Sequence, residues 1–74
     1  MLADELRQLV SGPAFRPFTV FAEGKAFRIA HPEFAALSPR GDTLIVFHEK
    51  DAAFDILDVA LIARAEAHEP TSPR

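Results

Sequence analysis

Apolar and polar positions alternate from Phe18 to Ala30, and this period of two predicts a β-hairpin. Glu23 and Gly24 divide the stretch, and the glycine can adopt the positive φ that a primed two-residue turn requires. A loop of these two residues determines which positions face each other across the hairpin. The expected pairs are Ala22 with Lys25, Val20 with Phe27, and Phe18 with Ile29.

The same alternation separates the two faces of the hairpin, because successive side chains of a strand point to opposite sides. One face is expected to form the core and carries Phe18, Val20, Phe27 and Ile29. The other face carries Thr19, Phe21, Ala26 and Arg28. Phe21 on this second face needs a cover. We expect the N-terminal helix to supply it, with a partner subunit and a nucleic-acid base as alternatives.

Apolar residues at helical spacing predict a short helix from Leu2 to Val10. The segment Ser11-Gly12-Pro13 follows as a typical stop signal. A helix of about nine residues is not stable alone in water. We therefore expect it to dock its apolar stripe on the sheet. The stripe consists of Leu2, Leu6, Leu9 and Val10.

Three further strands are expected after the hairpin, separated by turns of proline, glycine and charged residues. The first turn is His31-Pro32-Glu33. The strands are Phe34–Ser38, Thr43–His48 and Ala52–Leu57. The middle strand is apolar on both faces from Leu44 to Phe47. Such a strand is typically buried on both sides or used in an interface.

The chain from Asp58 onward fits two alternatives. Residue propensities favour a helix over Val59–Glu69, with Asp58 as its cap. The interpretation that we prefer is a single turn at residues 58–60 followed by a short strand, Leu61–Ala65, that closes the sheet. Residues 70–74 are expected to form a disordered tail.

The predicted fold is therefore mainly β within the α+β class. It consists of an N-terminal helix and a strongly bent antiparallel sheet of about five strands. Residues 1–69 are expected to form one small barrel domain.

The composition predicts a thin core. Of the 36 apolar residues among 74, 13 are alanines, which leaves 23 larger apolar side chains. A domain of this size without disulfides is marginally stable, and oligomerisation is a common remedy. We therefore expect a homo-oligomer that associates through strand edges, with other proteins as possible partners. The candidate interface residues are Leu44, Val46, Phe47, Phe54 and Ile56.

The net charge and the absence of cysteine from the sequence argue against several classes of function. Without cysteine there is neither a disulfide nor a thiolate metal site. The net charge of −3 disfavours general binding to a nucleic-acid backbone, which usually needs a basic face. The chain has no apolar run near the roughly 18 residues that cross a membrane. Its start is acidic rather than positively charged, so a cytoplasmic location is expected. No cofactor, metal or membrane surface is expected.

The turn at His31 and Glu33 is the most site-like polar cluster, because a histidine and a carboxylate can exchange a proton. No nucleophile or third orienting group accompanies them, so a structural turn and a non-enzymatic protein are favoured over an enzyme. His31, His48 and His68 also lack the spacing of metal ligands.

Nucleic-acid binding is the alternative function. Arginines beside an aromatic ring can contact and stack on single-stranded bases. The candidate contacts are Arg16, Phe21 and Arg28.

The order of elements resembles that of small SH3-like and Sm-like barrels, which have short strands and tight turns. The ending from Asp58 to Ile62 is similar to the turn and strand that close the bacterial Sm-like RNA chaperones. Those proteins carry a Lys-His pair there that contributes to uridine binding. Here Asp58 and Val59 occupy the matching positions, and an acid in place of the base argues against that RNA pocket.

A second resemblance rests on three short sequence motifs. The segments Phe15-Arg16-Pro17-Phe18, His31-Pro32-Glu33-Phe34 and Ile56-Leu57-Asp58 are similar to those of a group of small uncharacterised bacterial proteins of about this length. This resemblance implies no activity. The first functional hypothesis is an assembly or protein-interaction module, and it rests on the thin core and on the strand that is apolar on both faces.

Overall fold

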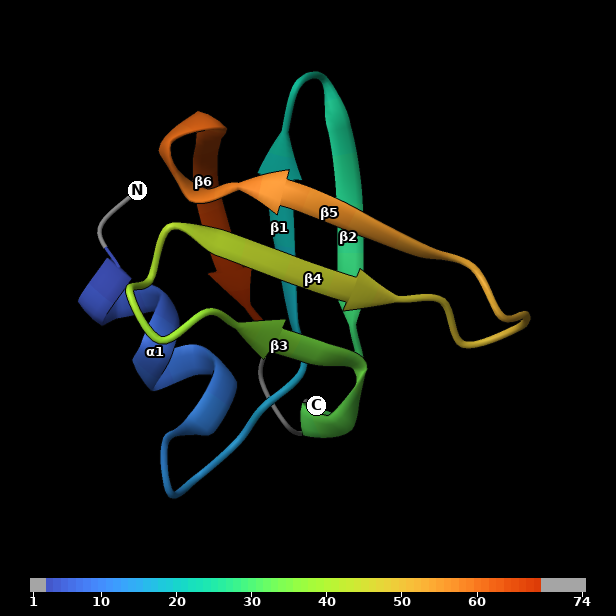
Figure 1. Cartoon of the computed structure of the whole chain (residues 1–74). Helices are drawn as coiled ribbons and strands as arrows, with labels where there is room; N and C mark the ends of the chain where they lie inside the picture. The colour runs from blue at the N-terminus through green and yellow to red at the C-terminus, as the bar shows by residue number, and fades with distance from the viewer. Residues whose placement is uncertain (1–2, 69–74) are drawn as a thin grey trace.

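The structure, a computed structural model, describes residues 3–68 and has an α+β fold that is mainly β (Figure 1). Its elements are α1 (Ala3–Ser11), β1 (Phe18–Ala22), β2 (Lys25–Ile29), β3 (Ala35–Leu37), β4 (Thr43–Phe47), β5 (Phe54–Asp58) and β6 (Ile62–Ala67). Two single-turn 3-10 helices, η1 (Pro32–Phe34) and η2 (Val59–Leu61), precede β3 and β6.

Within residues 3–68 the strands form two antiparallel sheets of three strands each. The first sheet has the order β2-β1-β6 and the second has the order β3-β4-β5. Figure 1 shows the strands of the second sheet crossing those of the first. The predicted class is confirmed, but residues 3–68 form neither a single bent sheet of about five strands nor a closed barrel, so both of these predictions are wrong.

The division into two sheets occurs at η1, between β2 and β3. Pro32 has no backbone N–H to contribute to a ladder, and it begins the 3-10 turn. The N–H of Phe34 donates to the carbonyl of His31 at 3.0 Å, which closes the turn. A continuous strand cannot pass through this turn. The chain therefore leaves the first sheet at Ile29 and enters the second at Ala35.

The hairpin of β1 and β2 has the predicted register, with Ala22 opposite Lys25 and Phe18 opposite Ile29. Glu23 has φ of 54° and Gly24 has φ of 78°. Two successive positive values are those of a type I′ turn, whose twist matches that of the flanking strands. Three of the four expected core side chains are fully buried, and Phe27 is half-buried.

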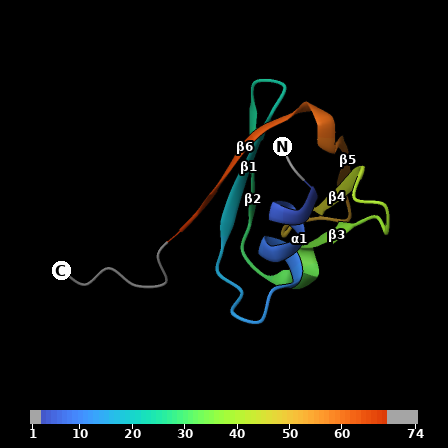
Figure 2. The same ribbon diagram turned by 90° about the vertical axis from the view of Figure 1, so that its left-hand side faces the viewer.

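Helix α1 lies at the open side between the two sheets, as Figure 2 shows. Its observed bounds are close to those predicted, although residues 1–2 lie outside the described part of the chain. Leu6 is fully buried, and Leu9 and Val10 pack against the core. The N–H of Gly12 donates to the carbonyl of Gln8 at 2.9 Å and ends the helix. The three described residues of the predicted stripe therefore face the core.

Both sheets and α1 contribute apolar side chains to one core. The buried set is Leu6, Phe18, Val20, Ala22, Ile29, Ala35, Leu44, Val46, Leu57, Val59 and Ile62. Phe15, on the lead-in to β1, packs edge-on against Phe18 with 6.0 Å between the ring centroids.

The end of the described chain follows the preferred interpretation, a turn and then a strand. The Oδ1 atom of Asp58 accepts a hydrogen bond from the N–H of Ala60 at 3.0 Å and caps η2. Strand β6 then runs antiparallel to β1 and completes the first sheet. The alternative helix over Val59–Glu69 is wrong. The predicted tail at residues 70–74 lies outside the described residues.

No helix in residues 3–68 has the length and apolar character that a membrane span requires.

Candidate interaction surfaces

The outer side of the second sheet carries a continuous set of apolar side chains. The strand registers place Ile45 opposite Ile56 and Phe47 opposite Phe54, with Ala36 opposite Ile45 on the other side. Because these positions alternate with the buried ones, they share the face that points away from the core. We call this set the apolar face, and it consists of Ala36, Ile45, Phe47, Phe54 and Ile56.

The large side chains of the apolar face are exposed to solvent. The exposed fraction is 38% for Phe47, 53% for Phe54 and 65% for Ile56. The rings of Phe47 and Phe54 lie 6.0 Å apart between centroids. The next cross-strand pair beyond Ile45 and Ile56 is polar, because Thr43 stands opposite Asp58. The apolar face is therefore uninterrupted by charge along β4 and β5 until that pair.

The structure divides the five candidate interface residues into two groups. Leu44 and Val46 are buried in the core of the subunit itself, so they are not available to a partner. Phe47, Phe54 and Ile56 are exposed. Ile45 and Ala36 lie on the same face as these three residues, but they were not among the interface residues expected from the sequence. The apolar run from Leu44 to Phe47 was the available signal, since it predicted that both sides of β4 need a cover.

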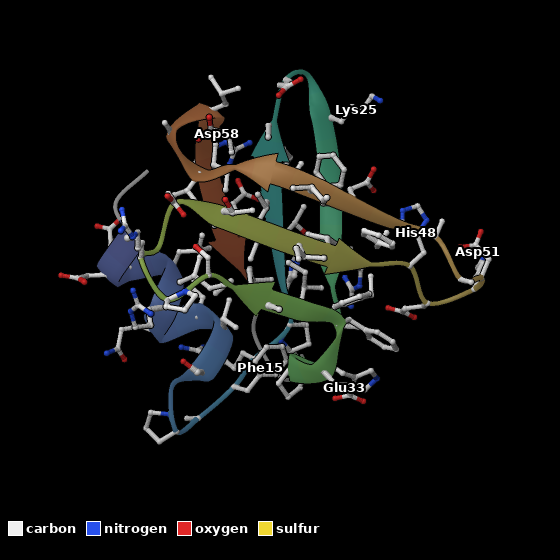
Figure 3. All side chains as sticks on the ribbon, in the orientation of Figure 1. Phe15, Lys25, Glu33, His48, Asp51 and Asp58 are labelled. Carbon is white, nitrogen blue, oxygen red and sulfur yellow. The ribbon has the colours of Figure 1, made fainter. Side chains whose placement is uncertain are left out.

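A groove of about 850 Å³ lies beside β2. One wall is β2, and the other is the connection between β4 and β5, which Figure 3 shows extending past β2 with His48 and Asp51 on it. We call it the β2 groove. Its lining consists of Lys25, Ala26, Phe27, Arg28, Val46, Phe47, His48, Glu49, Lys50, Asp51 and Asp55.

A histidine held between two carboxylates stands in the wall of the β2 groove. The Nε2 atom of His48 lies 2.7 Å from Oδ2 of Asp55, and its Nδ1 lies 3.7 Å from Oδ1 of Asp51. Asp51 Oδ1 also accepts a hydrogen bond from the N–H of Ala53 at 2.9 Å. With a carboxylate beside each ring nitrogen, His48 serves to fix this connection. The sequence reasoning did not bring these residues together, because they flank a turn whose pairing was unknown.

A second hollow, of about 330 Å³, lies at the polar end of β4 and β5. It is lined by Asp42, Thr43, Ile56, Leu57 and Asp58. Within residues 3–68, no three His, Cys, Asp or Glu side chains are grouped so that they could hold a metal ion.

The polar turn at His31 and Glu33 is exposed and lies outside both hollows. Figure 3 shows Glu33 on the outside of the molecule, at η1. The ring of His31 packs against that of Phe34, with 5.8 Å between centroids. The enzyme hypothesis requires a pocket beside these two residues, and neither hollow supplies one. The arrangement fits a structural turn.

Two of the three candidate nucleic-acid contacts share one surface. Phe21 and Arg28 lie on the outer face of the first sheet, whereas Arg16 lies on the lead-in before β1. The guanidinium of Arg64 covers the Phe21 ring at 4.1 Å from its centroid and pairs with Glu66. The expected cover by the N-terminal helix is therefore wrong. Arg64 comes from β6, whose pairing with β1 places it opposite Phe21.

A comparison of the chain with models of known protein families, with curated proteins and with solved structures found no match.

Proposed function

We propose that this chain is a non-enzymatic assembly module that forms a homo-oligomer through the apolar face of its second sheet. The supporting observation is the exposure of Phe54 and Ile56 at 53% and 65%, beside Phe47 and Ile45 on the same face. Burial of apolar surface stabilises an association by about 25 cal/mol for each Å² removed from water. Contiguous exposed apolar patches of this kind typically mark interaction sites.

A second copy of the chain is the occupant that best fits this face. In a two-fold contact the same residues meet their own copies, so a charged face would repel itself. The apolar face carries no charge at its five positions. Strand β5 is also an edge strand, but it carries Asp55 and Asp58, and charged residues discourage edge pairing. The apolar face, rather than the strand edge, therefore supports the proposed self-association.

The order of elements supports a relationship to small SH3-like or Sm-like barrels. A 3-10 turn precedes the last strand, and that strand returns to pair with β1. We infer this relationship from element order alone, and a shared fold does not by itself assign a function.

Sedimentation equilibrium at micromolar concentrations tests the proposed self-association. The wild-type chain is expected to have at least twice the monomer mass. Ile56→Glu and Phe54→Glu are expected to give monomers, because two copies would bury like charges against each other. Leu61→Glu is the matched control, since Leu61 is 54% exposed on η2, outside the apolar face. Its oligomer is expected to persist.

A wild-type monomer under these conditions would overturn the proposed function. An oligomer that Leu61→Glu dissociates and Ile56→Glu does not would assign self-association to another surface.

Nucleic-acid binding stays a prediction. Arg64 already occupies one side of the Phe21 ring, which leaves less of the ring for a base to stack on. The prediction requires binding to a single-stranded oligonucleotide that weakens with salt and with Arg28→Ala. Filter binding at low salt checks it.

A further inference from the structure

Strand β2 has a free edge, and the turn geometry determines which backbone groups face outward. In a two-residue hairpin the closing pair, Ala22 and Lys25, exchanges backbone hydrogen bonds, and the following pairs alternate. Phe27 and Ile29 therefore bond to β1, whereas the N–H and C=O groups of Ala26 and Arg28 point away from it. Among residues 3–68, neither Ala26 nor Arg28 has a backbone hydrogen bond to another element.

This free edge lies along the β2 groove, whose lining includes Ala26, Phe27 and Arg28. The four lining residues of β2, from Lys25 to Arg28, span about 13 Å at the rise of an extended strand. A strand added to β2 would lie about 4.8 Å from it, between β2 and the connection of β4 and β5.

The lining of the β2 groove has three basic and three acidic side chains, and of these six only two carboxylates have a partner among the described residues. Lys25, Arg28 and Lys50 have no ion-pair partner within the described residues. Asp51 and Asp55 are both engaged with His48. Glu49 is the remaining carboxylate of the lining.

We propose that the β2 groove binds an extended peptide, which adds to the edge of β2 as a further strand and has acidic and apolar side chains in alternation. Arg28 points to the outer face of the first sheet, so the ligand residue opposite it would be acidic. Phe27 points to the inner side, where the buried Val46 also lines the groove, so the ligand residue opposite it would be apolar. The outward N–H and C=O groups of Ala26 and Arg28 supply the main-chain hydrogen bonds.

The β2 groove shares Phe47 with the apolar face. Its strand edge belongs to the first sheet, however, and Phe54 and Ile56, which test the self-association, do not line it. Failure of either can therefore be recognised separately.

NMR titration tests the site with a short synthetic peptide that alternates glutamate and valine and is blocked at both ends. Saturable shifts are expected at the backbone amides of Ala26 and Arg28. A peptide in which lysine replaces glutamate is expected to bind wild type roughly tenfold more weakly or not at all.

Two variants separate the backbone contribution from the charge. Ala26→Pro removes an outward N–H on an edge strand, where proline is tolerated, and is expected to abolish binding. Arg28→Glu leaves the backbone unchanged and is expected to weaken binding roughly tenfold. Arg40→Glu, an exposed change in the turn between β3 and β4, is the charge control and is expected to bind normally.

Equal binding of the glutamate peptide to wild type and Arg28→Glu would overturn the proposal, and so would its failure to bind wild type. A fall in the sedimentation mass of Ala26→Pro would instead assign the edge to a second copy. Tighter binding of a single-stranded oligonucleotide at Arg28 would assign it to nucleic acid. Either result contradicts a peptide ligand.

Discussion

At the scale of single residues, two glycines with nearly equal φ angles have different surroundings. Gly24 has φ of 78°, and a methyl group at its Cα would meet no atom within 4 Å. Gly41 has φ of 79°, but its methyl group would lie 2.6 Å from Cβ of Ala3. Gly24 is therefore needed for its conformation alone. Gly41 is needed for its conformation and for the close approach of α1.

The first prediction compares alanine at these two positions. Gly24→Ala is expected to lower the free energy of unfolding by about 1 kcal/mol, because a left-handed conformation costs about that much for an L-residue. Gly41→Ala is expected to cost about 3 kcal/mol, since overpacking adds to the same strain. Urea denaturation measures both. Equal losses would show that α1 moves aside without cost.

A second residue-scale prediction concerns the cap of η2. Asp58→Ala removes the acceptor for the N–H of Ala60 and is expected to destabilise the fold by about 1 kcal/mol. Asp58→Asn keeps an acceptor oxygen and is the matched control, with a smaller expected loss. Thermal unfolding of the two variants distinguishes them. Similar melting temperatures would indicate that water replaces the cap.

At the scale of elements, the hairpin could be predicted from the sequence in full, because its turn and its alternation are local. The second sheet could not. Strand β4 has apolar side chains on both sides, so its sequence does not show which side faces the core. In β5 the charged Asp55 lies on the same side as the buried Leu57, which breaks the usual alternation of polar and buried positions. The rim of the β2 groove accommodates that carboxylate beside His48.

Strand β6 shows how tertiary pairing overrides local preference. Its sequence, with alanines, Arg64 and Glu66, favours a helix by propensity. The edge of β1 supplies backbone partners for an extended chain there, and Arg64 covers Phe21. The β2 groove was not predictable from the sequence, because it depends on how distant segments pair.

A third prediction belongs to helix α1. Leu6→Ala is expected to lower the free energy of unfolding by about 3 kcal/mol, because it opens a cavity at a fully buried position. Leu9→Ala, at a half-buried position of the same helix, is the control with a smaller expected loss. Urea denaturation compares them. A larger loss for Leu9→Ala would contradict the observed orientation of α1.

At the scale of the whole molecule, the core is small and a large apolar face remains outside it. The buried set includes two alanines, whereas Phe47, Phe54 and Ile56 lie in solvent. A subunit with this distribution gains stability when a copy covers the exposed side chains. Of the four exposed large apolar side chains in residues 3–68, three lie on the second sheet.

The fourth prediction follows from linkage between folding and association. The melting temperature of the wild-type chain is expected to rise with protein concentration, because only the folded state associates. Ile56→Glu is expected to remove this dependence while the far-ultraviolet circular dichroism remains that of the wild type. Scanning calorimetry over a concentration series checks it. A constant melting temperature in the wild type would contradict self-association.

Strand β6 also has a consequence for how the chain folds during synthesis. The first sheet joins residues 18–22 to residues 62–67 across most of the sequence. While the ribosome still encloses β6, the nascent chain has β1 with one side unpaired and Ile62 missing from the interior. Folding is therefore expected to finish only after release of these residues, and long-range pairing of this kind slows the final step.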